Sequence, residues 1–138
     1  MASSLPSRSA ALAHQTIALS KGLTKTFGGD EETQTFARLF MVPGAGHCGG
    51  LNGFHSANSG SPPPPSTDPD HDRFTALARW VENGSPPPRV VATSYVDNDA
   101  AKGIAMQRPL CPYPQKPWYK GGGDPNIAGN FACAVESR

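Results

Sequence analysis

A histidine and a cysteine stand side by side in the stretch FMVPGAGHCGG, residues 40–50, where an apolar run gives way to glycines. His47 has the side chain of a general base, because imidazole titrates near neutrality and can take a proton from a hydroxyl and return it to a leaving group. A loop histidine beside Cys48 without any catalytic role would show the same local sequence. The stretch therefore predicts a candidate base, which would need a nucleophile and an acid as partners.

The elements before His47 are predicted to place it at the edge of a sheet. Residues 11–26 form a helix in this prediction, with one face shared by Leu12, Thr16, Leu19 and Leu23 and an end at Gly28 and Gly29. Residues 36–42, FARLFMV, hold too few polar side chains for a strand with a solvated face, so we predict a strand buried on both sides. A helix followed by such a strand is typical of an α/β sheet. A glycine-rich loop after the strand could reach into a cleft at the sheet edge.

A second helix is predicted after a proline-rich loop at residues 56–69. Asp68 and Pro69 have the residue types of an N-cap and a first helical position. The helix ends at Gly84 and Pro86 and carries one apolar face, made of Phe74, Leu77, Ala78 and Val81.

The last part of the chain is predicted to be largely irregular. Residues 90–95, VVATSY, could form a short strand. Beyond Asp97 the sequence shows turns and little periodicity. Cys111 and Cys133 bracket this tail.

The totals limit the class of protein. The chain has 138 residues, enough for one modest domain, and its 15 prolines and 15 glycines favour turns and extended loops. A net charge of +1 argues against nucleic acid or an anionic membrane as partner. No apolar run reaches the length of about 18 residues that a spanning helix needs. The first residues are too interrupted for a secretory signal peptide, and three cysteines leave one without a partner within the chain.

Several segments resemble the tannase and feruloyl esterase family, whose members are secreted serine esterases with an α/β-hydrolase core. The stretch RLFMVPGAGHCGG is the most specific of them. The other matching segments follow in the family's order: ALSKGLTKTFGG and TQTFARLFMVPG before it, then FTALARWVENGSPPPRVVAT, RPLCPYPQKPWYKGGGD and GDPNIAGNFAC. The likeness covers residues 15–133, and residues 1–12 show none that we could match. We therefore assign residues 13–138 to an esterase-like domain and leave residues 1–12 as an unassigned extension.

The resemblance implies roles for individual residues. His47 matches the catalytic general base. Cys48 matches a cysteine that the family joins to the cysteine immediately before the nucleophilic serine, which would hold base and nucleophile together. Cys111 and Cys133 match a local disulfide pair of the family. On this basis we expect the Cys111–Cys133 bond and no partner for Cys48 within this chain.

The nucleophile and the acid of the family are missing from this sequence. No cysteine precedes a serine, no serine has the glycine frame of a nucleophile elbow, and the first aspartate, Asp30, follows the predicted first helix. The family's lid with its calcium site has no counterpart here, so we expect no cofactor in this chain. The resemblance thus implies a partial α/β-hydrolase fold: a helix, a buried strand, the histidine loop, a second helix and a disulfide-bonded tail. The compartment stays open, because the family is secreted and this chain shows no signal peptide.

Two other chemistries have weaker support. Asp68, Asp70 and Asp72 cluster near His71, and His55 lies earlier in the chain, so a metal site is conceivable; acids at a helix start would explain the cluster without a metal. Aromatic side chains could form a platform for a sugar or a phenol, or could simply fill a small core: Trp80, Tyr113, Trp118 and Tyr119.

Three hypotheses for function follow. In the first, the chain is the carboxy-terminal part of a phenolic ester hydrolase that uses a Ser-Asp-His mechanism, inactive alone and open to completion by an amino-terminal fragment. In the second, it is a noncatalytic remnant that binds a partner. In the third, it is a truncated product without a stable fold.

Overall fold

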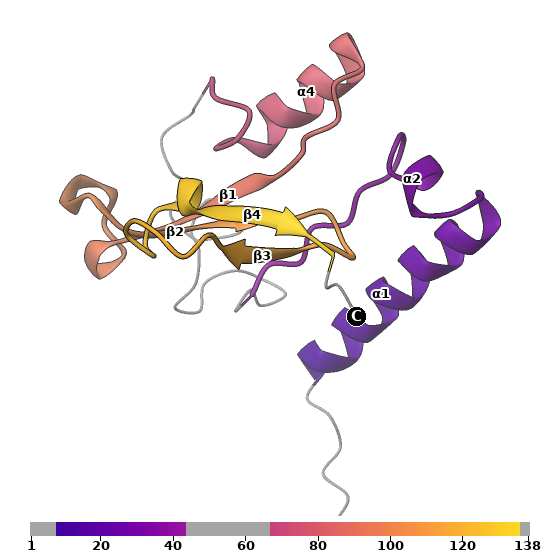
Figure 1. Cartoon of the computed structure of the whole chain (residues 1–138), viewed down its shortest axis with the longest axis horizontal. Coiled ribbons are helices and arrows are strands. Elements are labelled where there is room, and N and C mark those ends of the chain that lie inside the picture. Colours follow the sequence, from indigo (N-terminus) through magenta and orange to yellow (C-terminus); the bar gives the residue numbers. More distant parts are fainter. Residues whose placement is uncertain (1–7, 44–66, 136–138) are drawn as a thin grey trace, which may run out of the picture. The chain divides into compact units, whose positions relative to one another are not determined.

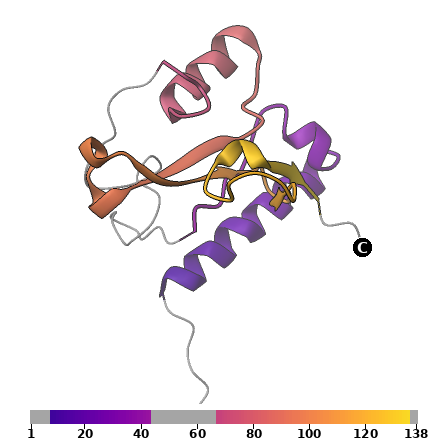
Figure 2. The same ribbon diagram turned by 60° about the vertical axis from the view of Figure 1, so that its left-hand side comes forward.

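The computed structural model describes residues 8–43 and 67–135, shown in Figures 1 and 2. The chain divides into a first unit, residues 1–38, and a second unit, residues 39–138. His47, Cys48, His55 and most of the proline-rich loop at 56–69 lie outside the described residues. No helix within the described ranges is long and apolar enough to cross a membrane.

The first unit contains the predicted helix. Helix α1 runs Arg8–Thr26 and is followed by the short helix α2, Asp30–Thr33. Gly28 and Gly29 separate them with φ of 90° and 116°, a backbone region that glycine enters without steric cost. The rings of Phe27 and Phe36 then meet edge to face, with centroids 5.1 Å apart. The prediction of a helix ended by this glycine pair is confirmed.

The predicted strand at residues 36–42 is wrong except at one position. The backbone N–H groups of Phe36 and Ala37 donate to the carbonyl of Thr33, so both residues belong to the turn after α2. Phe40 alone makes an isolated antiparallel bridge, with Pro112. The pairing does not extend, because proline has no N–H to offer a ladder. Residues 37–42 are half-buried, whereas a strand between two neighbours would be buried on both sides.

The described part of the second unit contains two antiparallel pairs of strands (Figure 1). Strand β1, Val90–Tyr95, pairs with β2, Ile104–Leu110. Strand β3, Lys116–Tyr119, pairs with β4, Phe131–Ala134. Short 3-10 turns connect them at Val96–Asn98, Ala100–Lys102 and Ala128–Asn130. The strand at 90–95 is confirmed, while the irregular tail is a wrong prediction, since three of these strands lie within it.

The small core of the second unit lies where β2 meets the residues that follow it. Val91 and Ala92 of β1 are buried, and so are Leu110 and Cys111 at the end of β2. Ala128, in the turn before β4, is also buried in this core. Apart from Leu110 these side chains are small, so the disulfide described below carries more of the stability than it would in a larger core.

Helix α4, Arg73–Asn83, begins four residues later than predicted. Its N-cap is Asp72, whose Oδ1 accepts from the backbone N–H of Thr75 at 2.7 Å. Asp68 starts the preceding turn instead, since its carbonyl accepts the N–H of Asp72 at 3.0 Å. The end at Gly84, with φ of 63°, is confirmed.

Candidate functional site

The structure describes the approach to the candidate base but not the base itself. His47 and Cys48 lie outside the described residues, and the described chain stops at Pro43, four positions before His47. What the structure places is therefore the anchor of the segment that carries His47. The roles of these two residues stay predictions.

The anchor is a contact between residues 39–40 and the start of the disulfide-bonded tail. The backbone N–H of Tyr113 donates to the carbonyl of Leu39 at 2.8 Å. Phe40 pairs with Pro112 in the isolated bridge. Pro112 is fully buried and adjoins Cys111, so the segment that leads to His47 is fastened beside a covalent crosslink.

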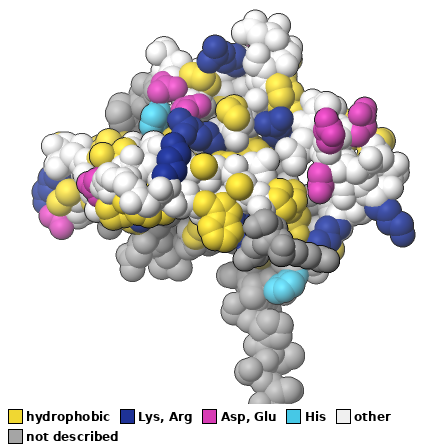
Figure 3. Space-filling model, in the orientation of Figure 1, with side chains coloured by type: hydrophobic (Ala, Val, Ile, Leu, Met, Phe, Trp, Pro, Cys, Tyr) yellow, Lys and Arg dark blue, Asp and Glu magenta, His cyan; other side chains and the backbone are white. Residues whose placement is uncertain are grey.

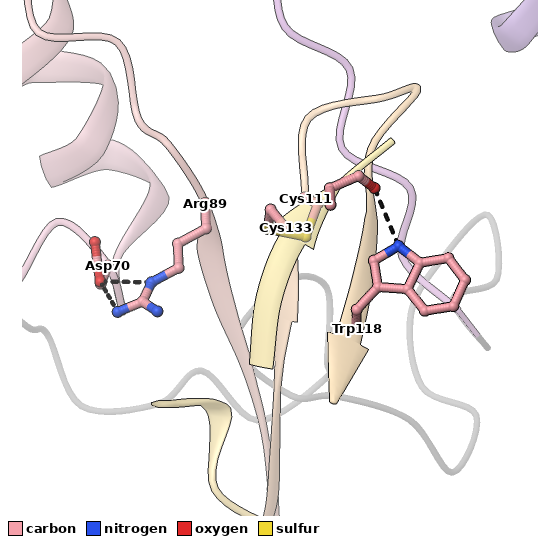
Figure 4. The surroundings of a disulfide bond; sticks show 6 residues. Asp70, Arg89, Cys111, Trp118 and Cys133 are labelled. Carbon is pink, nitrogen blue, oxygen red and sulfur yellow. Dashed lines mark hydrogen bonds and ion pairs between the residues drawn. A yellow bond between two sulfur atoms is a disulfide. The ribbon is translucent and has the colours of Figure 1, made fainter. Parts of the chain in front are cut away.

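The disulfide joins Cys111 to Cys133, the pairing that the resemblance implied. Their Cα atoms are 5.6 Å apart, and the bond connects the residue after β2 with β4 (Figure 4). Trp118 lies beside it on β3 and donates from Nε1 to the carbonyl of Ala134 at 3.3 Å. Residues 111–134 therefore form a hairpin that is closed by both ladder hydrogen bonds and a covalent link.

An ion pair ties the turn before α4 to the start of β1. Arg89 donates from Nε and Nη2 to Oδ2 of Asp70, at 3.0 and 2.8 Å (Figure 4). The backbone N–H of Val91 also donates to the carbonyl of Asp70, at 2.6 Å. Asp70 thus binds β1 through side chain and backbone together.

The candidate metal cluster DPDHD has structural partners within the chain. The backbone N–H of Asp70 and the ring of His71 hold the pKa of Asp68 below its ordinary value. Oδ2 of Asp68 accepts from Nδ1 of His71 at 2.8 Å, and the side-chain nitrogen of Gln107 lies 3.4 Å from Nε2 of the same ring. The backbone N–H of Thr75 likewise lowers the pKa of the capping Asp72. Among the described residues, no three His, Cys, Asp or Glu side chains converge as metal ligands.

The aromatic side chains that could form a platform or fill the core differ in exposure. Trp118 and Tyr119 follow one another on β3 and are each 43% exposed, whereas Trp80 is half-buried on α4. Tyr119 contacts Phe131 across the hairpin, with centroids 5.5 Å apart. The guanidinium of Arg108 lies over the Phe131 ring, 4.8 Å from its centroid.

An open cleft of about 360 Å³ lies beside the disulfide. Its lining includes Phe131 and the cations Arg89 and Lys120, and Figure 3 shows apolar side chains over the strands of this unit with Lys and Arg beside them. Both cations have partners within the chain: Arg89 binds Asp70, and Nζ of Lys120 donates to the carbonyl of Gly129 at 2.9 Å. The cleft lies between the hairpin and the residues Asp70, Pro88, Arg89 and Pro109, and both of its cations are engaged within the chain.

Sequence reasoning did not find the anchor around Pro112. No local pattern pairs residues 39–40 with residues 112–113, more than seventy positions later. The cysteine directly before Pro112 is the one signal that could have pointed there, because a disulfide fixes its neighbours in place.

The sequence of this chain is similar to those of known esterases. The family model described as tannase and feruloyl esterase matches residues 3–134, beginning within the segment that sequence analysis left unassigned. An uncharacterized esterase of Xanthomonas campestris pv. campestris is 44% identical over 108 residues, 78% of this chain and 19% of that protein. The mono(2-hydroxyethyl) terephthalate hydrolase of Piscinibacter sakaiensis is 45% identical over 101 residues, 72% of this chain and 14% of that protein. A probable feruloyl esterase of Arthroderma benhamiae is 38% identical over 110 residues, 79% of this chain and 18% of that protein.

Solved structures show the same fold. An esterase from Aspergillus oryzae superposes with a TM-score of 0.73 at 23% identity, over 86% of this chain and 24% of that one. Feruloyl esterase B from the same organism gives 0.72 at 22% identity, over 88% of this chain and 24% of that one. The predicted fold class, part of an α/β-hydrolase, is confirmed, and the chain spans only about a fifth of the length of its relatives. This chain belongs to the tannase and feruloyl esterase family.

Proposed function

We propose that residues 3–134 form the part of a carboxylic ester hydrolase that carries its general base, His47. The observation that carries the proposal is the family match across the whole histidine loop. The relatives include an esterase, a probable feruloyl esterase and a terephthalate ester hydrolase, which supports ester hydrolysis as the reaction class. Phenolic esters are the substrates that we expect.

The chemistry follows from one imidazole and a serine supplied by the rest of the enzyme. His47 takes the proton of the serine hydroxyl as its oxygen attacks the ester carbonyl. The imidazolium then protonates the departing alkoxide, and an acyl-serine and the free alcohol result. In the second half, His47 takes a proton from water, and the hydroxide oxygen attacks the acyl carbonyl. The proton returns to the serine, and the carboxylic acid leaves.

The contacts of the described residues support a positioning role for the tail. General-base catalysis needs the imidazole within hydrogen-bond reach of the hydroxyl, about 2.6–3.2 Å between heavy atoms. The Leu39–Tyr113 hydrogen bond and the Phe40–Pro112 bridge hold the start of the histidine segment beside the disulfide. Cys48, through the disulfide that the family resemblance implies, would hold its far side next to the nucleophile.

The test is a chimera with the Xanthomonas relative, in which this chain replaces the matching segment of that esterase. We expect the chimera to hydrolyse methyl ferulate or methyl gallate, and the isolated chain to be inactive, because it has neither the serine elbow nor the acid. His47→Ala should reduce kcat by a factor of about 10³ or more, as removal of a catalytic base does elsewhere. His71→Ala is the matched control, since His71 has its own partners, Asp68 and Gln107, and should leave kcat within a small factor. An active chimera that is indifferent to His47→Ala would contradict the assignment of the base.

A further inference from the structure

Helix α4 carries an apolar face that the described part of the chain leaves open. Phe74, Leu77 and Val81 are 70%, 53% and 77% exposed. Their spacing, i, i+3 and i+7, puts them on one side of the helix. The guanidinium of Arg73 approaches the Phe74 ring, 5.2 Å from its centroid, and still leaves that ring mostly exposed. The apolar face is thus a continuous surface of three large side chains.

The opposite side of α4 is the one that attaches the helix to its own unit. Ala76 is only 3% exposed and adjoins a cavity of about 260 Å³, which the prolines of residues 86–88 also line. Trp80, four residues after Ala76 on the same side of the helix, is half-buried. The helix therefore packs through the side of Ala76 and Trp80, and the side of Phe74, Leu77 and Val81 stays exposed.

The ends of α4 are fixed locally, by contacts that do not involve the apolar face. Asp72 caps its first turn, and Gly84 ends it with a left-handed conformation. An amphipathic helix in an α/β protein normally buries such a face against a sheet or another helix. Three large apolar side chains on a preformed helix make a surface that is ready for a partner.

The family comparison indicates what that partner is. This chain covers 24% of the solved esterase of the same fold, so about three quarters of that structure has no counterpart here. Helix α4 lies within the matched residues 3–134. We propose that the face of Phe74, Leu77 and Val81 docks onto the remaining part of a tannase-type esterase domain, on an apolar surface of that part. The inference rests on the fold that the proposed function requires, and it does not depend on which residue is the base.

The test introduces one charge on this face in two contexts. Leu77→Glu is made in the isolated full chain and in the chimera with the Xanthomonas esterase, and thermal unfolding and soluble yield are measured for each. We expect no change in the isolated chain, where the side chain is exposed, and a fall of several degrees in Tm or a loss of soluble protein in the chimera, where the charge would be buried without a partner. Asn83→Glu is the matched control, an exposed residue of the same helix away from the face, and should affect neither protein.

A milder variant covers the case in which the Leu77→Glu chimera does not fold. Val81→Thr keeps the shape of the side chain but adds a hydroxyl group. If the face is buried in the chimera, this substitution should lower the Tm in the same direction as Leu77→Glu, by a smaller amount. Equal destabilisation of the isolated chain would show that another segment of this chain covers the face. Disruption of a dimer of the isolated chain, seen by light scattering, would show that a second copy covers it. Either result, or an unchanged chimera, overturns the proposal. If the unmutated chimera hydrolyses the ester but its Tm does not change with Leu77→Glu, only the docking face is refuted. If the Tm of the chimera falls with Leu77→Glu but the unmutated chimera is inactive, only the proposed function is refuted.

Discussion

Replacing Cys111 and Cys133 together by alanine should remove a large share of the stability of the second unit. The bond joins positions 22 residues apart and connects the end of β2 to β4. In the chain-entropy model, closing a loop of this length in the unfolded chain stabilises the folded state by about 3 kcal/mol. Small domains unfold with a free energy of about 5–15 kcal/mol, and this unit has a core of small side chains. The loss should therefore be easy to measure.

Urea unfolding followed by tryptophan fluorescence is the suitable assay. Trp80 and Trp118 are the two tryptophans of the chain, and both lie in the second unit. We expect the double variant to unfold at lower urea concentration, with its free energy of unfolding reduced by about 3 kcal/mol. The wild-type chain in reductant should behave like the variant. Cys48→Ala should behave like the oxidised wild type, because we expect Cys48 to lack a partner in this chain.

Two results would refute this reasoning. A free-energy difference below about 1 kcal/mol, well under the loop-closure value, would mean that the β3–β4 ladder and the Phe40–Pro112 bridge hold the tail without the bond. A double variant less stable than the reduced wild type would point to lost packing of the buried Cys111 side chain in place of lost chain restraint.

Two further substitutions test contacts that the structure makes specific. Asp72→Ala should cost about 1 kcal/mol, the usual value of an N-cap, measured by urea unfolding at neutral pH. Because the folded pKa of Asp72 is lowered, its contribution is present above the unfolded value of about 3.9 and is lost as pH falls through the folded pKa, so wild type and variant should converge in acid. Gly123→Ala should destabilise the hairpin by about 1–3 kcal/mol, since φ is 84° and the new Cβ would lie 2.6 Å from Nδ2 of Asn130. Gly122→Ala is its control, with open space around the new Cβ, and equal effects of the two would contradict this explanation.

Residue type alone was sufficient to predict where the helices that end in glycine stop. A glycine pair stops α1 and a left-handed Gly84 stops α4, and both ends can be read from residue type because few other residues adopt these conformations. The first residue of α4 was harder to predict from the sequence. Asp68 and Asp72 are equally good caps by type, and only the turn between them decides that Asp72 begins the helix.

Contacts between distant residues were the part that sequence could not supply. Residues 36–42 have the composition of a buried strand, yet the one strand-like neighbour they have among residues 8–43 and 67–135 is Pro112, which cannot extend a ladder. Strands β3 and β4 have four residues each, too short for alternation to be distinguished from a turn. The disulfide pair and the esterase assignment came from resemblance, since three cysteines allow three pairings and spacing does not choose among them.

The apolar periodicity of α4 correctly predicts an amphipathic helix but does not identify what its apolar face packs against. The periodicity of Phe74, Leu77 and Val81 indicates an amphipathic helix, and the helix is present, but the side that packs within the second unit is that of Ala76. Periodicity describes which side chains share a face and says nothing about whether the partner of that face lies in the same unit. A chain that covers a fifth of its relatives' length is expected to carry such faces, because elements selected to pack within a larger domain keep their apolar side chains. The same reasoning applies to residues 36–42, whose apolar composition fits a strand with neighbours on both sides. We therefore expect both segments to be buried against the portion of a tannase-type esterase domain that has no counterpart in this chain.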